Sequence, residues 1–293
     1  TVAVSPLTLT SRELPPPNMP WRPATGPAGR LRDAALRGVV GLATRTMLDP
    51  QMNRLRAEFG LRPAPPGRLF DSTYSTDLVL AQGEPGLEFS RTDLPSSVRF
   101  VGRLAAPVAA GSAAELPPWW PDLAAARRVV HVTQGTLDTA PDDLLKPTLA
   151  ALADQDVLVV CTTGGADPAV LGTLPANARA AAFVPHDLLL PEVDVMVTNG
   201  GWGGVLAALQ AGVPLVVAGG SLDKPEVARR VAWSGAGIDL RTGSPKPARI
   251  AAAVREILDR PAFASRAQEI GMSLTAAGGP ARAGDLLDAL LAR

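Results

Sequence analysis

Four glycines lie in a short loop at residues 198–204, Thr-Asn-Gly-Gly-Trp-Gly-Gly, between a run typical of a buried strand and a run typical of a helix. Where a strand turns into a helix, unpaired backbone N–H groups and the positive end of the helix dipole attract an anion. Glycine has no Cβ atom to hold an oxyanion away from those groups. The loop is therefore a candidate phosphate site, although taken alone it is equally compatible with a structural turn.

Two more loops combine glycine with hydroxyl side chains directly after apolar runs, at residues 133–136 (Thr-Gln-Gly-Thr) and 162–165 (Thr-Thr-Gly-Gly). Gly135 permits a close backbone approach, and threonine hydroxyls can donate hydrogen bonds to an anion. In an open parallel sheet, ligands bind outside the carboxyl ends of the strands. We therefore expect these loops to share one edge of a sheet with the glycine loop.

A dinucleotide site is the main alternative for the glycine loop. Asp223 lies about 20 residues downstream, where a ribose-binding acid is expected. The third glycine of that fingerprint is missing, because Leu206 occupies its position, and the loop comes late in its domain rather than after the first strand. The glycine spacing therefore disfavours NAD.

The elements that must position these loops are regular after residue 126. Apolar strands alternate with helices, which predicts an α/β fold with a doubly wound parallel sheet covered on both faces. We predict strands at 128–133, 157–161, 180–184, 193–197 and 214–218, and helices at 143–154, 205–211, 247–258, 261–274 and 281–291.

The first hundred or so residues, by contrast, contain fewer recognisable elements, namely strands at 1–5, 78–81 and 98–102 and a helix at 37–59. A stretch rich in proline and small residues follows and is typical of a linker. We predict a first domain at 1–104, a linker at 105–126, and a second domain at 127–293 that includes the C-terminal helices.

Composition excludes several classes of function. Lys plus Arg and Asp plus Glu both number 28, which leaves no net charge to attract nucleic acid or anionic lipid. No apolar run is long enough to predict stable membrane insertion, and we expect a cytoplasmic protein. The single cysteine, Cys161, lies in an apolar strand and forms no disulfide within the chain. We expect His131 to be a core residue and Trp119 and Trp120 to pack between domains.

Together, and in this order, the motifs resemble those of the nucleotide-sugar glycosyltransferases of the GT-B fold, family 1, of the bacterial macrolide and natural-product type. The turn at 134–136 matches the end of that family's first C-terminal-domain strand, and 183–186 (Phe-Val-Pro-His) matches its base-binding motif. The loop at 199–204 matches the phosphate motif, and Asp223-Lys224 matches the closing acidic pair, usually Asp-Gln.

The resemblance implies a donor site in which the base lies near Phe183, the diphosphate lies on the glycine loop with help from Thr136, and Asp223 accepts hydrogen bonds from sugar hydroxyls. The donor would be a UDP- or dTDP-sugar, with no metal or cofactor. The donor-binding residues that it implies are Gly135, Thr136, Phe183, Val184, His186, Asn199, Gly200, Gly201, Trp202, Gly203, Gly204, Asp223 and Lys224.

This sequence departs from the family pattern in several places. Asn199 stands where the family usually places a phosphate-binding His, Ala207 replaces a ribose-binding Glu, and Lys224 replaces Gln. Residues 1–104 resemble only the second half of a GT-B N-terminal domain, and neither His131 nor His186 matches the family's catalytic His. The general base is therefore not identified in this chain.

The resemblance implies transfer of a sugar, with inversion, to a lipophilic small-molecule acceptor of the natural-product kind. Two alternatives stay open: a non-catalytic or truncated nucleotide-sugar-binding module that needs a partner, and a sugar-nucleotide epimerase of the same architecture. A homodimer is one assembly that the sequence leaves open. We expect this chain alone to bind UDP or dTDP without transferring sugar.

Overall fold

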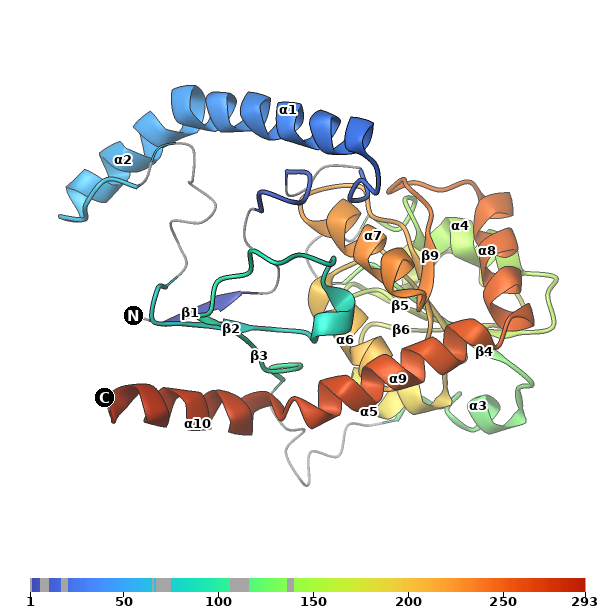
Figure 1. Ribbon diagram of the computed structural model, residues 1–293. Helices are drawn as coiled ribbons and strands as arrows, with labels where there is room; N and C mark the ends of the chain where they lie inside the picture. The colour runs from blue at the N-terminus through green and yellow to red at the C-terminus, as the bar shows by residue number, and fades with distance from the viewer. Residues whose placement is uncertain are drawn as a thin grey trace. The chain divides into compact units, whose positions relative to one another are not determined.

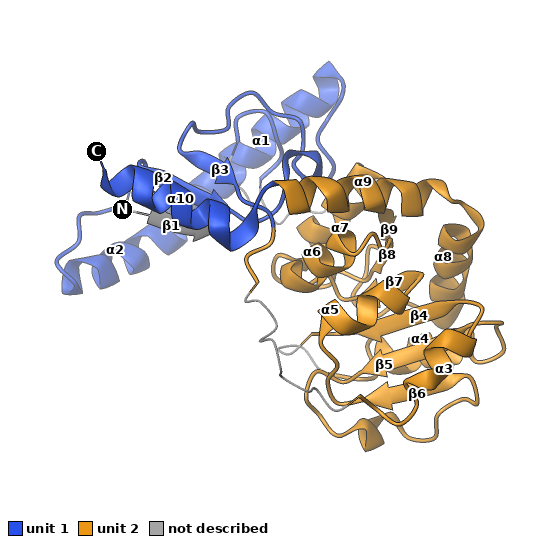
Figure 2. Cartoon of the chain, turned by 90° about the horizontal axis from the view of Figure 1, so that it is seen from below, with its two compact units in different colours: residues 1–102, 277–293 blue, residues 103–276 orange. Residues whose placement is uncertain are grey.

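The computed structural model describes residues 2–5, 11–16, 21–64, 66, 75–105, 116–135 and 140–292. The chain forms two compact units (Figures 1 and 2). The first combines Thr1–Gly102 with Ala277–Arg293, and the second is Arg103–Ala276. The last helix thus belongs to the first unit, whereas the sequence-based domain bounds place it with the second.

The second unit contains a six-stranded sheet in which every neighbouring pair is parallel, in the order β6-β5-β4-β7-β8-β9. The chain builds β4, β5 and β6 outward in one direction and then β7, β8 and β9 in the other, so the predicted doubly wound sheet is confirmed. The strands are β4 (Val129–Thr133), β5 (Leu158–Thr162), β6 (Ala178–Ala181), β7 (Val195–Thr198), β8 (Leu215–Val217) and β9 (Gly237–Asp239).

The helices described in the second unit are α3 (Pro121–Ala125), α4 (Leu145–Leu152), α5 (His186–Leu189), α6 (Trp202–Gln210), α7 (Lys224–Ser234), α8 (Pro247–Asp259) and α9 (Ala262–Ala276), with 3₁₀ turns at Pro168–Leu171 and Leu190–Glu192. Helices α4, α6, α7 and α8 contact strands of the sheet, and α5 and α9 pack on α6 (Figure 2).

Alternation along the strands assigns the helices to two faces. Val130 and Val132 of β4 are fully buried in one cluster with Leu149 of α4 and Ile250 of α8. Side chains of this kind each contribute about 1.5–3 kcal/mol when fully buried. The start of α6 instead lies against Met196 of β7, which points to the opposite face because successive side chains of a strand alternate.

The observed elements differ from the predicted ones at several points. Helix α6 begins at Trp202 rather than at 205, because tertiary packing outweighs the low helix propensity of the two glycines that follow. Helix α7 and strand β9 were not predicted, although Pro225 near the start of α7 is a helix-start signal. Strand β6 begins two residues before its predicted position, at Ala178.

The first unit contains a three-stranded parallel sheet in the order β1-β2-β3, formed by Val2–Ser5, Leu78–Ala81 and Val98–Phe100. Its helices are α1 (Pro27–Ala43), α2 (Asp49–Glu58) and α10 (Gly279–Leu291), with a 3₁₀ turn at Pro85–Leu87.

The helix predicted at 37–59 begins earlier and is not continuous. It starts at Pro27 and is interrupted by a π-helical segment at Thr44–Leu48 before α2 begins. Pro50 explains the interruption, because proline lacks the N–H that would bond one turn back and its ring crowds that carbonyl.

Two of the packing predictions can be compared with the structure. Cys161 is fully buried in β5, as expected. The indole N–H of Trp119 donates to the carbonyl of Ala180 at 3.0 Å, and the Trp119 and Trp120 rings stack with centroids 6.2 Å apart. Trp119 therefore contacts β6 within the second unit.

Candidate functional site

Strands β4 and β7 are adjacent in the sheet, and Thr133 at the end of β4 is paired with Thr198 at the end of β7. The chain leaves these two strands in opposite directions along the sheet, so their carboxyl ends form the point where the strand order reverses. Ligands of doubly wound sheets bind at such a point. The fold therefore places residues 133–135 of one predicted loop beside the predicted loop at 198–204.

Asn199 joins these two loops. Its side-chain N–H donates to the carbonyl of Gln134, and its Oδ1 accepts from the N–H of Gly201 at 3.3 Å. The residue is only 6% exposed, so the amide is held inside the turn. Asn199 thus fixes the geometry of the glycine loop. The predicted contact of Thr136 lies outside the described residues.

The glycine loop has the backbone that an anion site requires. Gly200 has φ +90°, in the left-handed region, and its N–H donates to Oγ1 of Thr198 at 3.3 Å. Gly201 then caps α6. Among the described residues, no acceptor is bonded to the N–H groups of Gly203 and Gly204 in the first turn of that helix. A Cβ at Gly203 would meet nothing within 4 Å, so the turn is open there.

One side of the loop lies against the start of α7. A Cβ on Gly200 would come within 2.9 Å of Cγ1 of Val217 and 3.4 Å of the carbonyl oxygen of Lys224. Asp223 is the N-cap residue of α7, half-buried and without a side-chain cap hydrogen bond, and Lys224 is buried. The predicted acidic pair is therefore brought beside the glycine loop.

The other side of the loop lies against the predicted base-binding motif. The Cε1 atom of His186 is 3.6 Å from the position that a Cβ on Gly204 would occupy. In the same motif Val184 is buried, whereas Phe183 is 66% exposed, so its ring has an apolar face available for stacking. The structure thus gathers three predicted motifs around one helix start. Trp202, which opens that helix, is itself buried.

His186 is a neutral ring at neutral pH. Burial lowers its pKa, the nearby Arg103 cation lowers it further, and Asp187 opposes both. Arg103 and Asp187 form an ion pair at 2.7 Å. His186 can therefore offer hydrogen bonds to a ligand without adding a positive charge to the site.

His131 lies next to His186, in the sheet. It is fully buried in β4, and its Nδ1 donates to the carbonyl of Val160 at 3.0 Å. Its ring meets that of His186 edge to face, with centroids 5.9 Å apart. Burial, with a smaller contribution from His186, lowers the pKa of His131 to about 3. The predicted core location is confirmed, but Nε2 has no hydrogen-bond partner among the described residues.

Sequence reasoning identified Asp223 in the loop between β8 and α7 but missed the two glycines near the start of this loop. Gly219 and Gly220 approach the backbone of Lys224 and Gly243 so closely that neither could carry a Cβ. A glycine pair directly after a predicted strand was the available signal. Leu222, next to Asp223, has φ +55°, a strained conformation for a residue other than glycine, and nothing in the sequence indicated it.

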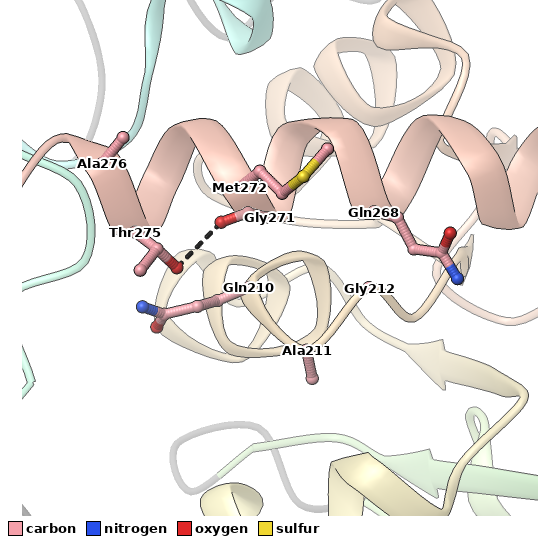
Figure 3. A pocket seen from close by; sticks show the side chains of 8 residues that line it. All are labelled: Gln210, Ala211, Gly212, Gln268, Gly271, Met272, Thr275 and Ala276. Carbon is pink, nitrogen blue, oxygen red and sulfur yellow. Dashed lines mark hydrogen bonds between the residues drawn. The ribbon is translucent and has the colours of Figure 1, made fainter.

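A separate pocket of about 490 Å³ lies between α6 and α9 (Figure 3). Within it the hydroxyl of Thr275 donates to the carbonyl of Gly271 at 2.9 Å. The pocket includes Gln210, the last residue of α6, and so lies at the opposite end of that helix from the glycine loop. Its lining is Gln210, Ala211, Gly212, Gln268, Gly271, Met272, Thr275 and Ala276.

In the described part of the chain, no group of three or more His, Cys, Asp or Glu side chains is arranged to hold a metal ion. None of its helices has the length and apolar character needed to cross a membrane.

Comparisons with known proteins agree with this geometry. Residues 146–290 match the family model of the erythromycin biosynthesis protein CIII-like C-terminal domain. The chain is 40% identical over 290 residues to 4'-demethylrebeccamycin synthase of Lentzea aerocolonigenes, which covers 99% of this chain and 68% of the relative. The chain belongs to the GT-B natural-product glycosyltransferases.

Other relatives support this family assignment. UDP-glucosyltransferase B1 of Starmerella bombicola is 40% identical over 216 residues, 71% of this chain and 50% of that enzyme. Among solved structures, the calicheamicin glycosyltransferase CalG4 matches 86% of this chain and 62% of its own, with 28% identity and a TM-score of 0.67. The glycosyltransferase VinC in complex with dTDP matches 91% and 64%, with 26% identity and a TM-score of 0.60. The chain thus spans between half and about two thirds of the length of these glycosyltransferases.

Proposed function

We propose that the protein transfers a sugar from a UDP- or dTDP-sugar to a lipophilic small-molecule acceptor with inversion at the anomeric carbon, and that this chain carries the donor site. One observation carries the proposal: an open glycine turn at the reversal point of the sheet lies between His186 on one side and Asp223-Lys224 on the other. Relatives named for UDP-glucose transfer and a neighbour that holds dTDP support the two donor classes.

The glycine turn would hold the diphosphate. The N–H groups of Gly203 and Gly204 face no acceptor among the described residues, and they lie at the positive end of α6. Charge builds up on the diphosphate as it leaves the sugar, so donors fixed in advance at this place stabilise the transition state. The protein's own field supplies this stabilisation, and the proposal therefore needs no metal or cofactor.

The remaining donor contacts follow from the neighbours of the turn. Asp223, which makes no cap hydrogen bond to α7, would accept hydrogen bonds from sugar hydroxyls. The exposed ring of Phe183 would stack on the base, with Val184 and His186 beside it. An inverting transfer also needs a general base for the acceptor hydroxyl, and that residue stays unassigned. The cytoplasmic location stays a prediction from the sequence, and a homodimer stays an open possibility.

Titration calorimetry with matched ligands tests the donor site. We expect the chain to bind UDP or dTDP, and to bind the corresponding sugar nucleotide more tightly. Asp223→Asn should weaken binding of the sugar nucleotide about tenfold, because it alters a contact with the sugar. Binding of UDP or dTDP, which carry no sugar at that contact, should not change. Asp156→Asn is the control, since Asp156 forms only an exposed ion pair with Arg127.

A transfer assay separates binding from catalysis. The chain is incubated with a sugar nucleotide and a phenolic acceptor, and the product is sought by mass spectrometry. We expect binding without turnover by this chain alone, as predicted from the sequence. Failure of both UDP and dTDP to bind would contradict the donor site, and turnover by the chain would contradict the prediction that it binds the nucleotide without transferring sugar.

A further inference from the structure

Three neighbouring strands of the second unit end in the same local pattern: a threonine, one further residue and a glycine. They are β5, β4 and β7, and the pattern falls at residues 162–164, 133–135 and 198–200. The three threonines are paired in register, and all three glycines have φ in the left-handed region, at +72°, +75° and +90°. The residues between threonine and glycine therefore occupy equivalent positions, and they are Thr163, Gln134 and Asn199.

Two of these three middle side chains are used within the protein. The hydroxyl of Thr163 donates to the carbonyl of Ala166. The side-chain N–H of Asn199 donates to the carbonyl of Gln134, and its Oδ1 accepts from the N–H of Gly201 at 3.3 Å. Both ends of the Asn199 amide thus hold the turns in place, which disfavours the phosphate contact that the resemblance implies for this residue.

The side chain in the middle turn is the exception. Gln134 is only 4% exposed, and Oε1 of its amide is fully buried without a hydrogen-bond donor among the described residues. Nε2 of the amide likewise donates to none of them. A buried amide that makes no hydrogen bond costs free energy, and such groups are rare in folded proteins. The fold of this chain therefore gives the amide no partner, and a ligand that accepts from Nε2 would recover part of that free energy.

Position and chemistry both favour a phosphate as that ligand. The carbonyl of Gln134 is bonded to Asn199 at the start of the glycine loop, so the side chain leaves the backbone next to the proposed diphosphate site. Because Oε1 is the buried end of the amide, Nε2 is the end left for a ligand. A primary amide offers N–H donors at that end, and phosphate oxygens are acceptors.

We propose that Gln134 is a further binding residue of the donor site, whose Nε2 donates a hydrogen bond to an oxygen of the diphosphate. The contact rests on the proposed function, and it adds a neutral side-chain donor to the backbone N–H groups at the start of α6. A hydrogen bond from a neutral donor to a charged oxygen is stronger than one between two neutral groups. The amide of Asn199 thus fixes the turn, and the amide of Gln134 binds the ligand.

Calorimetry with three ligands tests this contact. Gln134→Met keeps the length of the side chain and removes the donor. It should weaken binding of UDP, dTDP and UDP-glucose about tenfold, and by the same factor, because all three carry the diphosphate. Gln155→Met is the control, since Gln155 is exposed and precedes β5, at the opposite edge of the sheet from the glycine loop. The control should bind all three ligands as tightly as the unchanged chain does.

Gln134→Glu separates a phosphate from a hydroxyl as the partner. The carboxylate keeps the shape of the side chain and an acceptor, loses the N–H donors, and brings a negative charge towards the diphosphate. We expect it to weaken binding of all three ligands more than Gln134→Met does, because like charges repel. With a ligand hydroxyl as the partner, Gln134→Glu would instead bind at least as tightly as the unchanged chain.

Urea unfolding of Gln134→Met distinguishes ligand binding from packing. Because the substitution removes a buried amide that has no partner, the free energy of unfolding should stay the same or rise. Weaker nucleotide binding without a loss of stability is a result that a purely structural role does not produce. Gln134→Leu, which also removes the amide, carries the test should the Met variant not fold.

Three results would overturn the contact. They are a folded Gln134→Met that binds UDP as tightly as the unchanged chain, a Gln134→Glu that binds the nucleotides at least as tightly, and a loss of affinity in Gln134→Met for UDP-glucose alone. In each case the unchanged chain still binds UDP, so the proposed function stands. Absence of UDP and dTDP binding in the unchanged chain would instead contradict the proposed function, and the contact with it.

Discussion

At the scale of single residues, glycines in one loop are present for different physical reasons. Gly200 is required by its backbone, since its φ of +90° and the 2.9 Å approach to Val217 exclude a side chain. Gly203 has helical backbone and open space around it, so the fold alone does not require glycine there. A Cβ at Gly203 would instead obstruct the approach of a ligand to the start of α6.

This difference gives a prediction for Gly203→Ala. The variant should keep or slightly raise the free energy of unfolding, because alanine favours a helix over glycine by up to about 1 kcal/mol. It should nevertheless weaken nucleotide binding about tenfold, because the methyl group covers the N–H groups proposed to hold the diphosphate. Urea unfolding and calorimetry measure the two effects.

Gly284→Ala in α10 is the matched control for that variant. Gly284 is also a helical glycine with nothing within 4 Å of an added Cβ, but it lies in the other unit. The Gly284→Ala variant should change the free energy of unfolding by about as much as Gly203→Ala does, without changing the affinity for the nucleotide. Equal affinities of Gly203→Ala and the unchanged chain would remove the first turn of α6 from the donor site.

At the scale of elements, the placement of α6 depends on the close approach of α9. An added Cβ on Gly271 of α9 would come within 2.5 Å of the carbonyl oxygen of Leu209 and 3.0 Å of that of Gln210. Both oxygens belong to the last turn of α6. The helix whose N-terminus is the proposed anion site is therefore held at its other end by a contact between backbones.

We expect Gly271→Ala to lower the free energy of unfolding of the chain by about 1–3 kcal/mol, because the two helices must separate to admit the methyl group. The helix propensity of alanine acts in the opposite direction and is smaller. Met272→Ala is the control, since Met272 is on the same helix but 67% exposed. Urea unfolding measures the free energy of unfolding of both variants. Equal losses of stability in Gly271→Ala and Met272→Ala would show that the contact between the two backbones is not tight.

At the scale of the whole molecule, the neutral buried His131 makes stability depend on pH. Its pKa is about 3 in the folded chain, against an ordinary value near 6.5 in the unfolded chain. At a pH between these two pKa values, the unfolded chain binds more protons than the folded chain. The free energy of unfolding therefore falls as the pH falls below about 6.5. The slope from one such group is at most about 1.4 kcal/mol per pH unit.

The prediction is that His131→Phe flattens this part of the pH profile. Urea unfolding at intervals from pH 4.5 to 7.5 should show a smaller loss of stability towards acid in the variant than in the unchanged chain, because phenylalanine takes up no proton in either state. Carboxylates titrate in both proteins and cancel in the difference. Parallel profiles would show that His131 is protonated in the folded chain more readily than its burial indicates.

The order of motifs, the parallel strands and the alternation of strand with helix could all be predicted from the sequence. Each depends on a local pattern: apolar runs such as Val195–Thr198, turn glycines such as Gly200, and their spacing. Elements without such a pattern were missed. The short strand β9 contains a glycine and an aspartate, and α7 is a mostly buried helix rich in charged residues.

Only the tertiary structure decided which loops meet. The hydrogen bond from Asn199 to Gln134 joins residues 65 positions apart, and it forms because β7 inserts beside β4 in the sheet. The edge-to-face contact of His131 with His186 and the approach of α9 to α6 have the same origin. Local periodicity determines the kind of element that a segment forms, whereas the neighbour of each element is set by packing that no single segment encodes.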